Sequence, residues 1–300
     1  MPSAVRAAAP AKLNLALSVG PPNADRMHPI ASWMVTVDLF DDLQLARLPE
    51  GSLSRYAIEW HPEARRRTPI DWSISKDLAV RAHLAIEALV GRPLPLQLRL
   101  RKRIPVGGGL GGGSSDAAAM IRAVDALYGL GLDRDTCRSI ASSLGSDVPF
   151  LLEGGSAIVE GLGERLERHD RLPTVHAVLL LPEIACPTGP IYRRFDDLPD
   201  PRLDAARVRS LVGDSIPPHA PFNDLAEAAC LEAEGLRGIR EELSEIAERP
   251  AHVSGSGSTL FVLCDDDLHA RALSTAVEER LGTPAVFVRG SEPPAPTVIE

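Results

Sequence analysis

Lysine is scarce in this 300-residue chain, because only Lys12, Lys76 and Lys102 stand among its 32 basic residues. Arginine carries a wide fork that is always charged, whereas lysine is a compact charge with an adjustable pKa. A retained lysine therefore marks either a place where a guanidinium would not fit or chance retention. The neighbouring residues must decide between the two.

Other absences exclude whole classes of protein. No uninterrupted apolar run approaches the roughly 20 residues that a membrane span requires. Acidic residues outnumber basic ones by 41 to 32, and the formal charge of -9 is the wrong sign for a surface that binds nucleic acid or an anionic membrane. We expect neither of these partners. Any anionic ligand must be held at a local site.

Cysteine is also rare, and its spacing excludes a disulfide or zinc framework. The four cysteines form no CxxC pair and have no histidine at zinc-ligand spacing. We expect them to be reduced and mostly buried. The first residues, MPSAVRAAAP, lack the apolar core of a secretion signal, so a cytoplasmic protein is the simplest prediction.

What the chain does contain is an ordinary globular composition, 44% hydrophobic and 24% charged, and a length that suggests two domains. A predicted hairpin over residues 154–163 closes the first domain, which gives domains at 1–172 and 173–300. Strands separated by amphipathic helices favour an α+β fold. In the first domain we expect strands at 12–19, 33–39 and 94–102, helices at 77–90, 117–127 and 134–144, and an irregular stretch at 49–72. In the second we expect strands at 176–181, 251–254, 259–264 and 285–289, and helices at 223–233, 236–247 and 268–281.

The first of these strands, KLNLALSV, carries a large apolar residue at every second position and smaller or polar residues between them. Its apolar face should pack on a core, which leaves Lys12 and Asn14 together on the opposite face. A half-exposed strand commonly carries polar residues on its outer face. This pattern alone therefore favours no functional role for the two residues.

Six glycines occupy seven positions over residues 107–113, between a predicted strand and a predicted helix that begins at Ser114 or Ser115. Glycine lets backbone N–H groups approach an anion, and a helix N-terminus adds further donors. We prefer a phosphate site to a flexible linker, because a linker does not run from a strand directly into a helix. No lysine follows these glycines as in GxxxxGK[ST], and no regular βα alternation supports a dinucleotide fold.

Two further segments are ambiguous by themselves. Residues 254–258, SGSGS, are typical either of a tight hairpin or of a second loop whose amides meet a phosphate. Asp147 follows the helix that Asp133 begins and Gly145 ends, so it could merely cap a turn. Local sequence assigns it no catalytic role.

Taken together, three motifs in one order resemble the GHMP small-molecule kinase superfamily: PAKLNL at 10–15, PVGGGLGGGSSDAA at 105–118 and SGSGS at 254–258. The patterns GSDVPF at 145–150, GLGE at 161–164 and FNDL at 222–225 are most similar to the branch that phosphorylates the 2-hydroxyl of a cytidine diphosphate-linked methylerythritol, in the non-mevalonate route to isoprenoids. The resemblance implies a two-domain fold, with an N-terminal domain like ribosomal protein S5 domain 2, a C-terminal ferredoxin-like domain and a site between them.

The resemblance also implies roles for particular residues. Lys12 and Asp147 match the catalytic pair, in which the aspartate accepts the proton of the attacking hydroxyl. ATP is the expected phosphate donor, with Mg²⁺ near the hydroxyl of Ser114 or Ser115. The residues that would bind ATP are Lys102, Pro105, Val106, Gly107, Gly108, Gly109, Leu110, Gly111, Gly112, Gly113, Ser114 and Ser115. The residues that would bind the alcohol substrate are Asn14, His28, Thr188, Tyr192, Gly255 and Ser256.

Two departures from the family pattern keep other interpretations open. Met27 stands where the family usually has a tyrosine beside His28, and Asp77 stands where it commonly has an asparagine near the adenine pocket. Met27 keeps a related kinase of homoserine, mevalonate or a sugar as the alternative, and Asp77 leaves the nucleotide preference open. A catalytically silent nucleotide-binding module is a second alternative, against which the retained Lys12 and Asp147 argue. We expect a small-molecule substrate and ATP as partners, and a monomer or weak homodimer.

Overall fold

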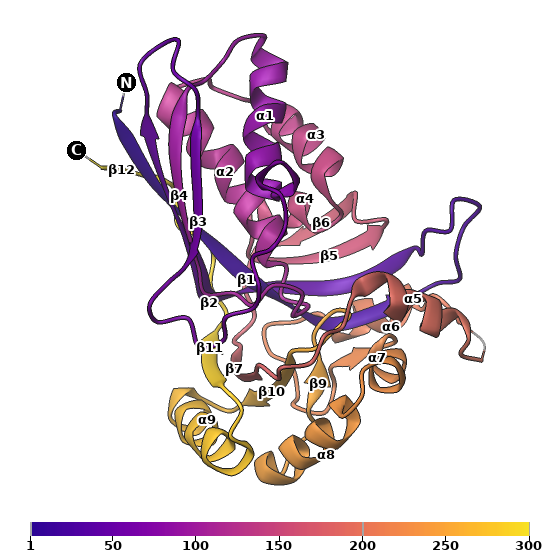
Figure 1. Cartoon of the computed structure of the whole chain (residues 1–300). Coiled ribbons are helices and arrows are strands. Elements are labelled where there is room, and N and C mark those ends of the chain that lie inside the picture. Colours follow the sequence, from indigo (N-terminus) through magenta and orange to yellow (C-terminus); the bar gives the residue numbers. More distant parts are fainter. Residues whose placement is uncertain (1, 200, 300) are drawn as a thin grey trace.

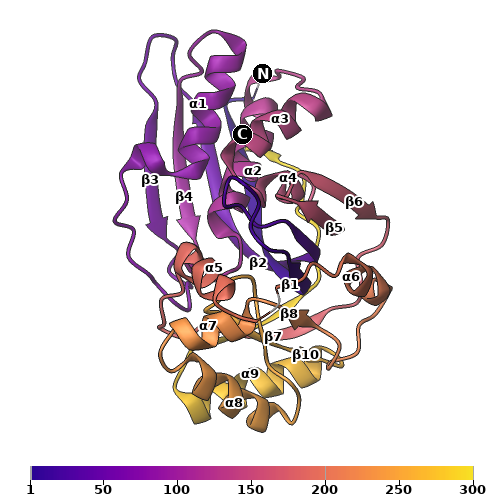
Figure 2. The same cartoon turned by 90° about the vertical axis from the view of Figure 1, so that its right-hand side faces the viewer.

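Two long strands, β1 (Ala4–Val19) and β2 (Ile30–Arg47), pair over almost their whole length and form the centre of the first sheet. The computed structural model describes residues 2–199 and 201–299. Its first sheet runs in the order β12-β1-β2-β4-β3, with β5 and β6 extending from β2 and a short β8 parallel to β1. Helices α1 to α4 cover one face of this sheet (Figures 1 and 2).

The remaining elements follow in chain order. They are β3 (Arg55–Trp60), η1 (Ile74–Lys76), α1 (Leu78–Val90), β4 (Leu96–Lys102), α2 (Gly112–Tyr128), α3 (Arg134–Leu144), α4 (Val148–Leu151), β5 (Ser156–Gly161), β6 (Arg165–His169), β7 (His176–Leu180), α5 (Thr188–Asp196), α6 (Ala205–Leu211), β8 (Phe222–Asn223), α7 (Ala226–Glu232), α8 (Leu236–Ala247), β9 (His252–Val253), β10 (Leu260–Cys264), α9 (Asp267–Leu281), β11 (Ala285–Arg289) and β12 (Thr297–Ile299).

The core of the first unit lies between its sheet and its helices. On β4, Leu96, Leu98 and Leu100 alternate with more exposed residues and bury their side chains in this core. The helix boundaries follow local sequence signals, since Asp77 and Asp133 cap the N-termini of α1 and α3 through their carboxylates. These caps and the apolar face of β4 confirm the predicted helices and strand.

The second unit is a four-stranded antiparallel sheet in the order β11-β7-β10-β9, with α7, α8 and α9 on one face (Figure 1). The sequence of β7 is apolar at consecutive positions because both faces of the strand are buried. Val178 and Leu180 face the helices, whereas Ala177 and Leu179 join a third core with Leu13 and other residues of β1 and β2. Because both faces of β7 are covered, the two units share an apolar interface.

Several sequence predictions need correction. The first strand begins at Ala4 and is buried on both faces from Ala9 onward, so Lys12 and Asn14 do not lie on a half-exposed surface. The stretch 49–72 is not wholly irregular, because it contains the edge strand β3, whose mixed polar sequence hid it. Helix α2 begins at Gly112, ahead of the predicted serines, and α5 and α6 had no predicted counterpart.

The expected domain boundary at residue 172 stays a prediction, but two later strands return to the sheet of the first unit. Strands β8 and β12 both follow that point, yet both pair with β1 of the first sheet. The start of β1 consequently lies beside the end of β12, where Ala4 pairs with Ile299. All four cysteines are free and three are buried, as expected. Within the described ranges, no helix combines the length and apolarity needed to cross a membrane.

Candidate active site

A cavity of about 500 Å³ lies where the glycine-rich loop meets the second unit. Its walls come from β1, the start of α2, the turn after α3, helix α5 and the β9–β10 loop. It is lined by most of the residues that the sequence singled out: Lys12, Asn14, Lys102, Pro105, Val106, Gly107, Gly108, Gly109, Leu110, Gly111, Gly112, Gly113, Ser114, Asp147, Thr188, Tyr192, Gly255 and Ser256. Segments that are far apart in the chain thus form one pocket.

The glycine-rich loop is held in place through its carbonyl groups. The Leu110 carbonyl accepts a hydrogen bond from Lys12 N at 2.9 Å, and the Gly108 carbonyl accepts one from Thr259 N at 3.2 Å. Ser254 Oγ donates to the Gly109 carbonyl at 3.1 Å. These contacts fix the loop to both units, next to the N-terminus of α2, which is a ready-made anion site.

The β9–β10 loop, which contains the SGSGS segment, is both a hairpin connection and a loop that borders the cavity. It is a hairpin connection, because Val253 pairs with Leu260, and it also lines the cavity through Gly255 and Ser256. A β-carbon on Gly255 would lie 3.2 Å from Lys12 Nζ, and one on Gly111 would lie 2.9 Å from Lys12 Cγ. Glycines from two loops therefore make room for the lysine side chain.

Lys12 and Asp147 face each other across this space. The Lys12 ammonium donates to Asn14 Oδ1 at 2.6 Å and lies 3.7 Å from Asp147 Oδ2. Asn14 is itself fixed, since its amide donates to Ser32 Oγ at 2.8 Å. The Lys12 side chain is 5% exposed and that of Asp147 is 28% exposed. A buried cation thus lies beside a carboxylate that remains open to the cavity.

Helix α5 places an aromatic ring, that of Tyr192, and a hydroxyl, that of Thr188, in the wall of the cavity. Thr188 Oγ1 lies 3.2 Å from Ser256 Oγ, which joins α5 to the β9–β10 loop. Burial, with a smaller effect from the charge of Asp147, raises the pKa of Tyr192 to about 12. Tyr192 is therefore neutral at physiological pH and presents both an apolar ring and a hydroxyl.

Two predicted residues lie outside the set that lines the cavity. The ring of His28 packs against Tyr192 with 4.9 Å between ring centroids, but its Nε2 pairs with Asp196 Oδ1 at 2.7 Å. Ser115 is completely buried, and its hydroxyl has no hydrogen-bond partner among the described residues. His28 therefore contacts Tyr192 rather than the cavity, and the Ser115 side chain is buried away from the cavity.

Lys102 lines the cavity floor, but its ammonium is already occupied. It donates to Asp41 Oδ2 and to Asp116 Oδ2, each at 2.5 Å. Burial lowers the pKa of Lys102, but the charges of Asp116 and Asp41 outweigh this and raise it overall. Burial also raises the pKa of Asp116 well above its ordinary range.

Asp77, the other departure from the family pattern, has a local structural role. Its Oδ1 accepts from the backbone N–H groups of Ala79 and Val80, and its Oδ2 accepts from Trp72 Nε1 at 3.1 Å. All three partners are donors, which suits a carboxylate because it only accepts. Asp77 therefore caps the N-terminus of α1.

Sequence reasoning missed most of the apolar lining. Leu17, Ile30, Met34, Leu78 and Leu225 also face the cavity. Two of these had a recognisable signal, since Leu78 follows the Asp77 cap and Leu225 ends the FNDL motif. Ile30 and Met34 had none, because an alternating apolar strand does not reveal which of its residues borders a pocket.

The fold and the site define a class of protein. Residues 77–155 match the family model described as GHMP kinases N terminal domain, and residues 221–282 match GHMP kinases C terminal. The chain belongs to the GHMP kinase family, and it is a small-molecule kinase. The family implies ATP as phosphate donor.

Particular relatives narrow the comparison further. A 4-diphosphocytidyl-2-C-methyl-D-erythritol kinase of Caulobacter sp. (strain K31) is 36% identical, with 90% of this chain and 92% of that protein covered. One from Thermobifida fusca (strain YX) is 34% identical, with 99% of both chains covered. The crystal structure of a 4-(cytidine 5'-diphospho)-2C-methyl-D-erythritol kinase superposes with a TM-score of 0.76 at 32% identity, with 95% of this chain and 99% of that chain covered. A homoserine kinase from Cytophaga hutchinsonii has a TM-score of 0.70 at 18% identity, with 100% and 98% covered, and shares the fold.

Proposed function

We propose that this protein transfers the γ-phosphate of ATP to the 2-hydroxyl of 4-diphosphocytidyl-2-C-methyl-D-erythritol, a step of the non-mevalonate isoprenoid pathway. The observation that carries the proposal is the Lys12–Asp147 pair, which opens into the same cavity as the glycine-rich loop. Relatives covering nearly the whole chain, which are named for this reaction, support the choice of substrate.

In this mechanism, Asp147 acts on the attacking hydroxyl. Its carboxylate accepts a hydrogen bond from the hydroxyl and so orients the oxygen toward the γ-phosphate. The carboxylate receives the proton as the new O–P bond forms and the bond from the γ-phosphorus to the ADP leaving group breaks. Lys12 places a positive charge 3.7 Å from that carboxylate and offsets negative charge on the transferred group. Asn14 positions the lysine through its 2.6 Å hydrogen bond.

The donor phosphates would lie along residues 107–114. Backbone amides of the glycine-rich loop and the N-terminus of α2 would bind them, in place of the lysine of other phosphate loops. When bound, Mg²⁺ would neutralise phosphate charge, and among the two predicted serines Ser114 fits it better because Ser114 lines the cavity and Ser115 does not. The hydroxyl oxygen of Ser114 is a hard donor of the kind that this ion prefers.

The cytidine side would be formed by Tyr192 and its neighbour His28, with Met27 next to His28 in the chain. Tyr192 provides the aromatic face for the base, and His28, whose Nε2 pairs with Asp196 Oδ1 at 2.7 Å, packs against the Tyr192 ring. Met27 is 52% exposed, so it is free to contact a bound base with its thioether. Thr188, Gly255 and Ser256 would contact the alcohol moiety.

Other expectations remain proposals of the same kind. We propose a cytoplasmic enzyme that acts as a monomer or weak homodimer, without nucleic acid or a membrane as partner. The four free cysteines are consistent with a reducing compartment. A related small-alcohol kinase stays the alternative, since the fold is shared with a homoserine kinase and Met27 changes the cytidine side.

The test is a direct substrate comparison. Purified protein is incubated with ATP, Mg²⁺ and either 4-diphosphocytidyl-2-C-methyl-D-erythritol, homoserine or mevalonate, and phosphorylated product is measured by mass spectrometry. We expect product from the cytidyl compound alone. Product only from another alcohol would replace the substrate, and ATP binding without any product would favour a silent nucleotide-binding module.

A further inference from the structure

Asp41 is a completely buried aspartate on β2 that the mechanism does not use. Strands β2 and β4 pair antiparallel, with Asp42 opposite Arg101 as the last pair toward the glycine-rich loop. One step further in the same register, Asp41 comes opposite Lys102, the last residue of β4. The carboxylate therefore lies where the strand ends and the loop begins.

Both oxygens of Asp41 are used at this point. Its Oδ1 accepts from the backbone N–H groups of Arg103 and of Ile104, the latter at 2.8 Å. Its Oδ2 accepts from Lys102 Nζ at 2.5 Å. One buried carboxylate thus binds three consecutive residues of the segment that leads into the loop. Two of these hydrogen bonds run from backbone N–H groups to the aspartate side chain, as aspartates also form in turns.

The same group of charges reaches the phosphate-binding helix. Lys102 also donates to Asp116, which lies in α2 about one turn after its start and is 2% exposed. A β-carbon placed on Gly112 would come within 3.8 Å of Asp41 Oδ2 and 2.9 Å of Ile104 Cγ2. Asp41, Lys102 and Asp116 therefore join β2, β4 and α2 directly beneath the N-terminus of α2.

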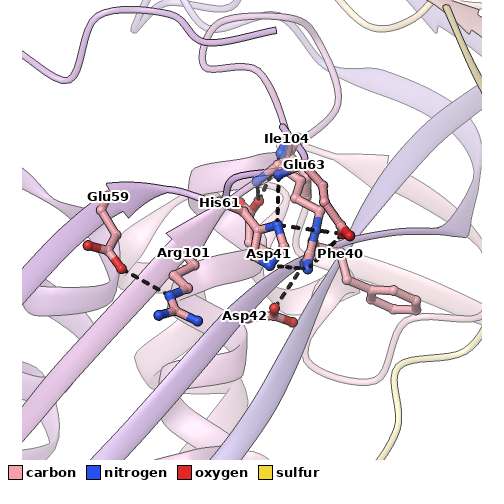
Figure 3. Close-up of polar contacts among 9 residues, drawn as sticks. Phe40, Asp41, Asp42, Glu59, His61, Glu63, Arg101 and Ile104 are labelled. Carbon is pink, nitrogen blue, oxygen red and sulfur yellow. Dashed lines mark hydrogen bonds and ion pairs between the residues drawn. The ribbon is translucent and has the colours of Figure 1, made fainter. Parts of the chain in front are cut away.

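The outer side of the segment is held as well. The Arg103 guanidinium donates to the Phe40 carbonyl at 3.0 Å and to Asp42 Oδ2 at 2.9 Å, and it lies 2.7 Å from His61 Nε2. Figure 3 shows Phe40, Asp41, Asp42 and His61 gathered around this point, with Ile104 beside them. The segment that leads into the loop is consequently held in two ways. The buried Asp41 binds its backbone, and the Arg103 side chain binds the carbonyl and carboxylate groups on its more exposed side.

We infer that Asp41 is a positioning residue of the nucleotide site: through Lys102 and the backbone of Arg103 and Ile104, it fixes the entry of the glycine-rich loop and the start of α2 in the form that binds phosphate. It touches no reacting atom. The inference rests on the proposed use of this loop for ATP, and it assigns Lys102 to holding α2 rather than mainly to contacting the nucleotide. The two roles of Lys102 predict opposite results when Asp41 loses its charge.

The experiment compares Asp41→Asn with Tyr128→Phe in the full-length protein. The asparagine keeps the shape and one acceptor for the backbone donors but removes the charge from Lys102. Tyr128 ends α2 at its far end, and its hydroxyl donates to the Pro95 carbonyl at 2.6 Å, so its loss removes another buried hydrogen bond of the same helix. Affinity for a non-hydrolysable ATP analogue, KM for each substrate, kcat and the urea unfolding midpoint are measured.

We expect Asp41→Asn to weaken nucleotide binding about tenfold or more and to raise KM for ATP, because charge-assisted hydrogen bonds are the stronger class. KM for the alcohol substrate should stay within about twofold. Tyr128→Phe should lower the unfolding midpoint but leave nucleotide affinity unchanged. Tighter or unaltered nucleotide binding in Asp41→Asn would overturn the inference, and so would an equal loss of affinity in both variants.

A second variant keeps the inference testable if Asp41→Asn does not fold. Arg103→Gln loosens the same segment from its partly exposed side, and we expect it to weaken nucleotide binding about threefold without changing KM for the alcohol. Wild-type affinity in Arg103→Gln would then contradict the inference. If the wild-type protein itself binds no ATP analogue, the proposed function fails instead, so the two failures are distinguishable.

Discussion

Replacement of Gly109 by alanine tests how tightly the two units are joined at the glycine-rich loop. A β-carbon on Gly109 would lie 2.1 Å from the Ser254 carbonyl oxygen and 3.0 Å from that of Gly257. Both neighbours are backbone, so no side chain can move aside. The variant must separate the glycine-rich loop from the β9–β10 loop.

Gly107 offers a matched control. Its φ of 73° is close to the 76° of Gly109, but a β-carbon there meets nothing within 4 Å. Left-handed backbone costs a non-glycine residue about 1 kcal/mol, and we expect Gly107→Ala to lose about that much stability. Gly109→Ala should also break the hydrogen bonds from Ser254 Oγ and Thr259 N, at about 1 kcal/mol each.

Urea denaturation monitored by circular dichroism measures the difference. We expect Gly109→Ala to lose about 3 kcal/mol of unfolding free energy, against about 1 kcal/mol for Gly107→Ala. Equal losses in the two variants would show that the loops do not approach each other as closely as described, and would refute the argument that the loop is fixed to both units.

Three further predictions follow from the site and its supports. Lys12→Met should lower kcat by about a hundredfold or more while circular dichroism shows a folded protein, because the cation beside Asp147 is lost; wild-type turnover would remove Lys12 from the mechanism. Asp77→Ala should cost about 1 kcal/mol of unfolding free energy in urea, and Asp77→Asn clearly less because it keeps the Oδ1 acceptor; equal losses would deny the cap its role. The folded pKa of Tyr192, about 12, exceeds the unfolded value of about 10, so the native state holds this proton more tightly. That stability is present at neutral pH and is lost as the pH rises from about 10 toward 12. Tyr192→Phe should therefore flatten the alkaline fall in unfolding free energy, and an unchanged slope would contradict the cause assigned to the shift.

The parts of the site that sequence could predict are those with local signals. A run of six glycines between a strand and a helix needs no tertiary contact to indicate a phosphate loop, and the structure places that loop on the cavity. Asp133 likewise revealed the start of the helix that it caps. The roles of Lys12 and Asp147 came from resemblance, and the structure adds that the two lie side by side.

The parts that sequence could not predict depend on contacts between distant segments. The burial of Lys12 follows from the loops packed over β1, which an alternating strand does not reveal. Asp41 is separated by 61 positions from Lys102, and Lys102 by 14 from Asp116, so no short motif unites the three. Strand β12 is recognisable only by its pairing with β1.

The most direct test of the central claim is phosphate transfer by the wild-type protein and by Asp147→Asn, measured under single-turnover conditions with ATP, Mg²⁺ and 4-diphosphocytidyl-2-C-methyl-D-erythritol. We expect phosphorylated product from the wild type and a rate lower by about a hundredfold or more in Asp147→Asn, with nucleotide affinity retained. A wild-type rate in Asp147→Asn would contradict it.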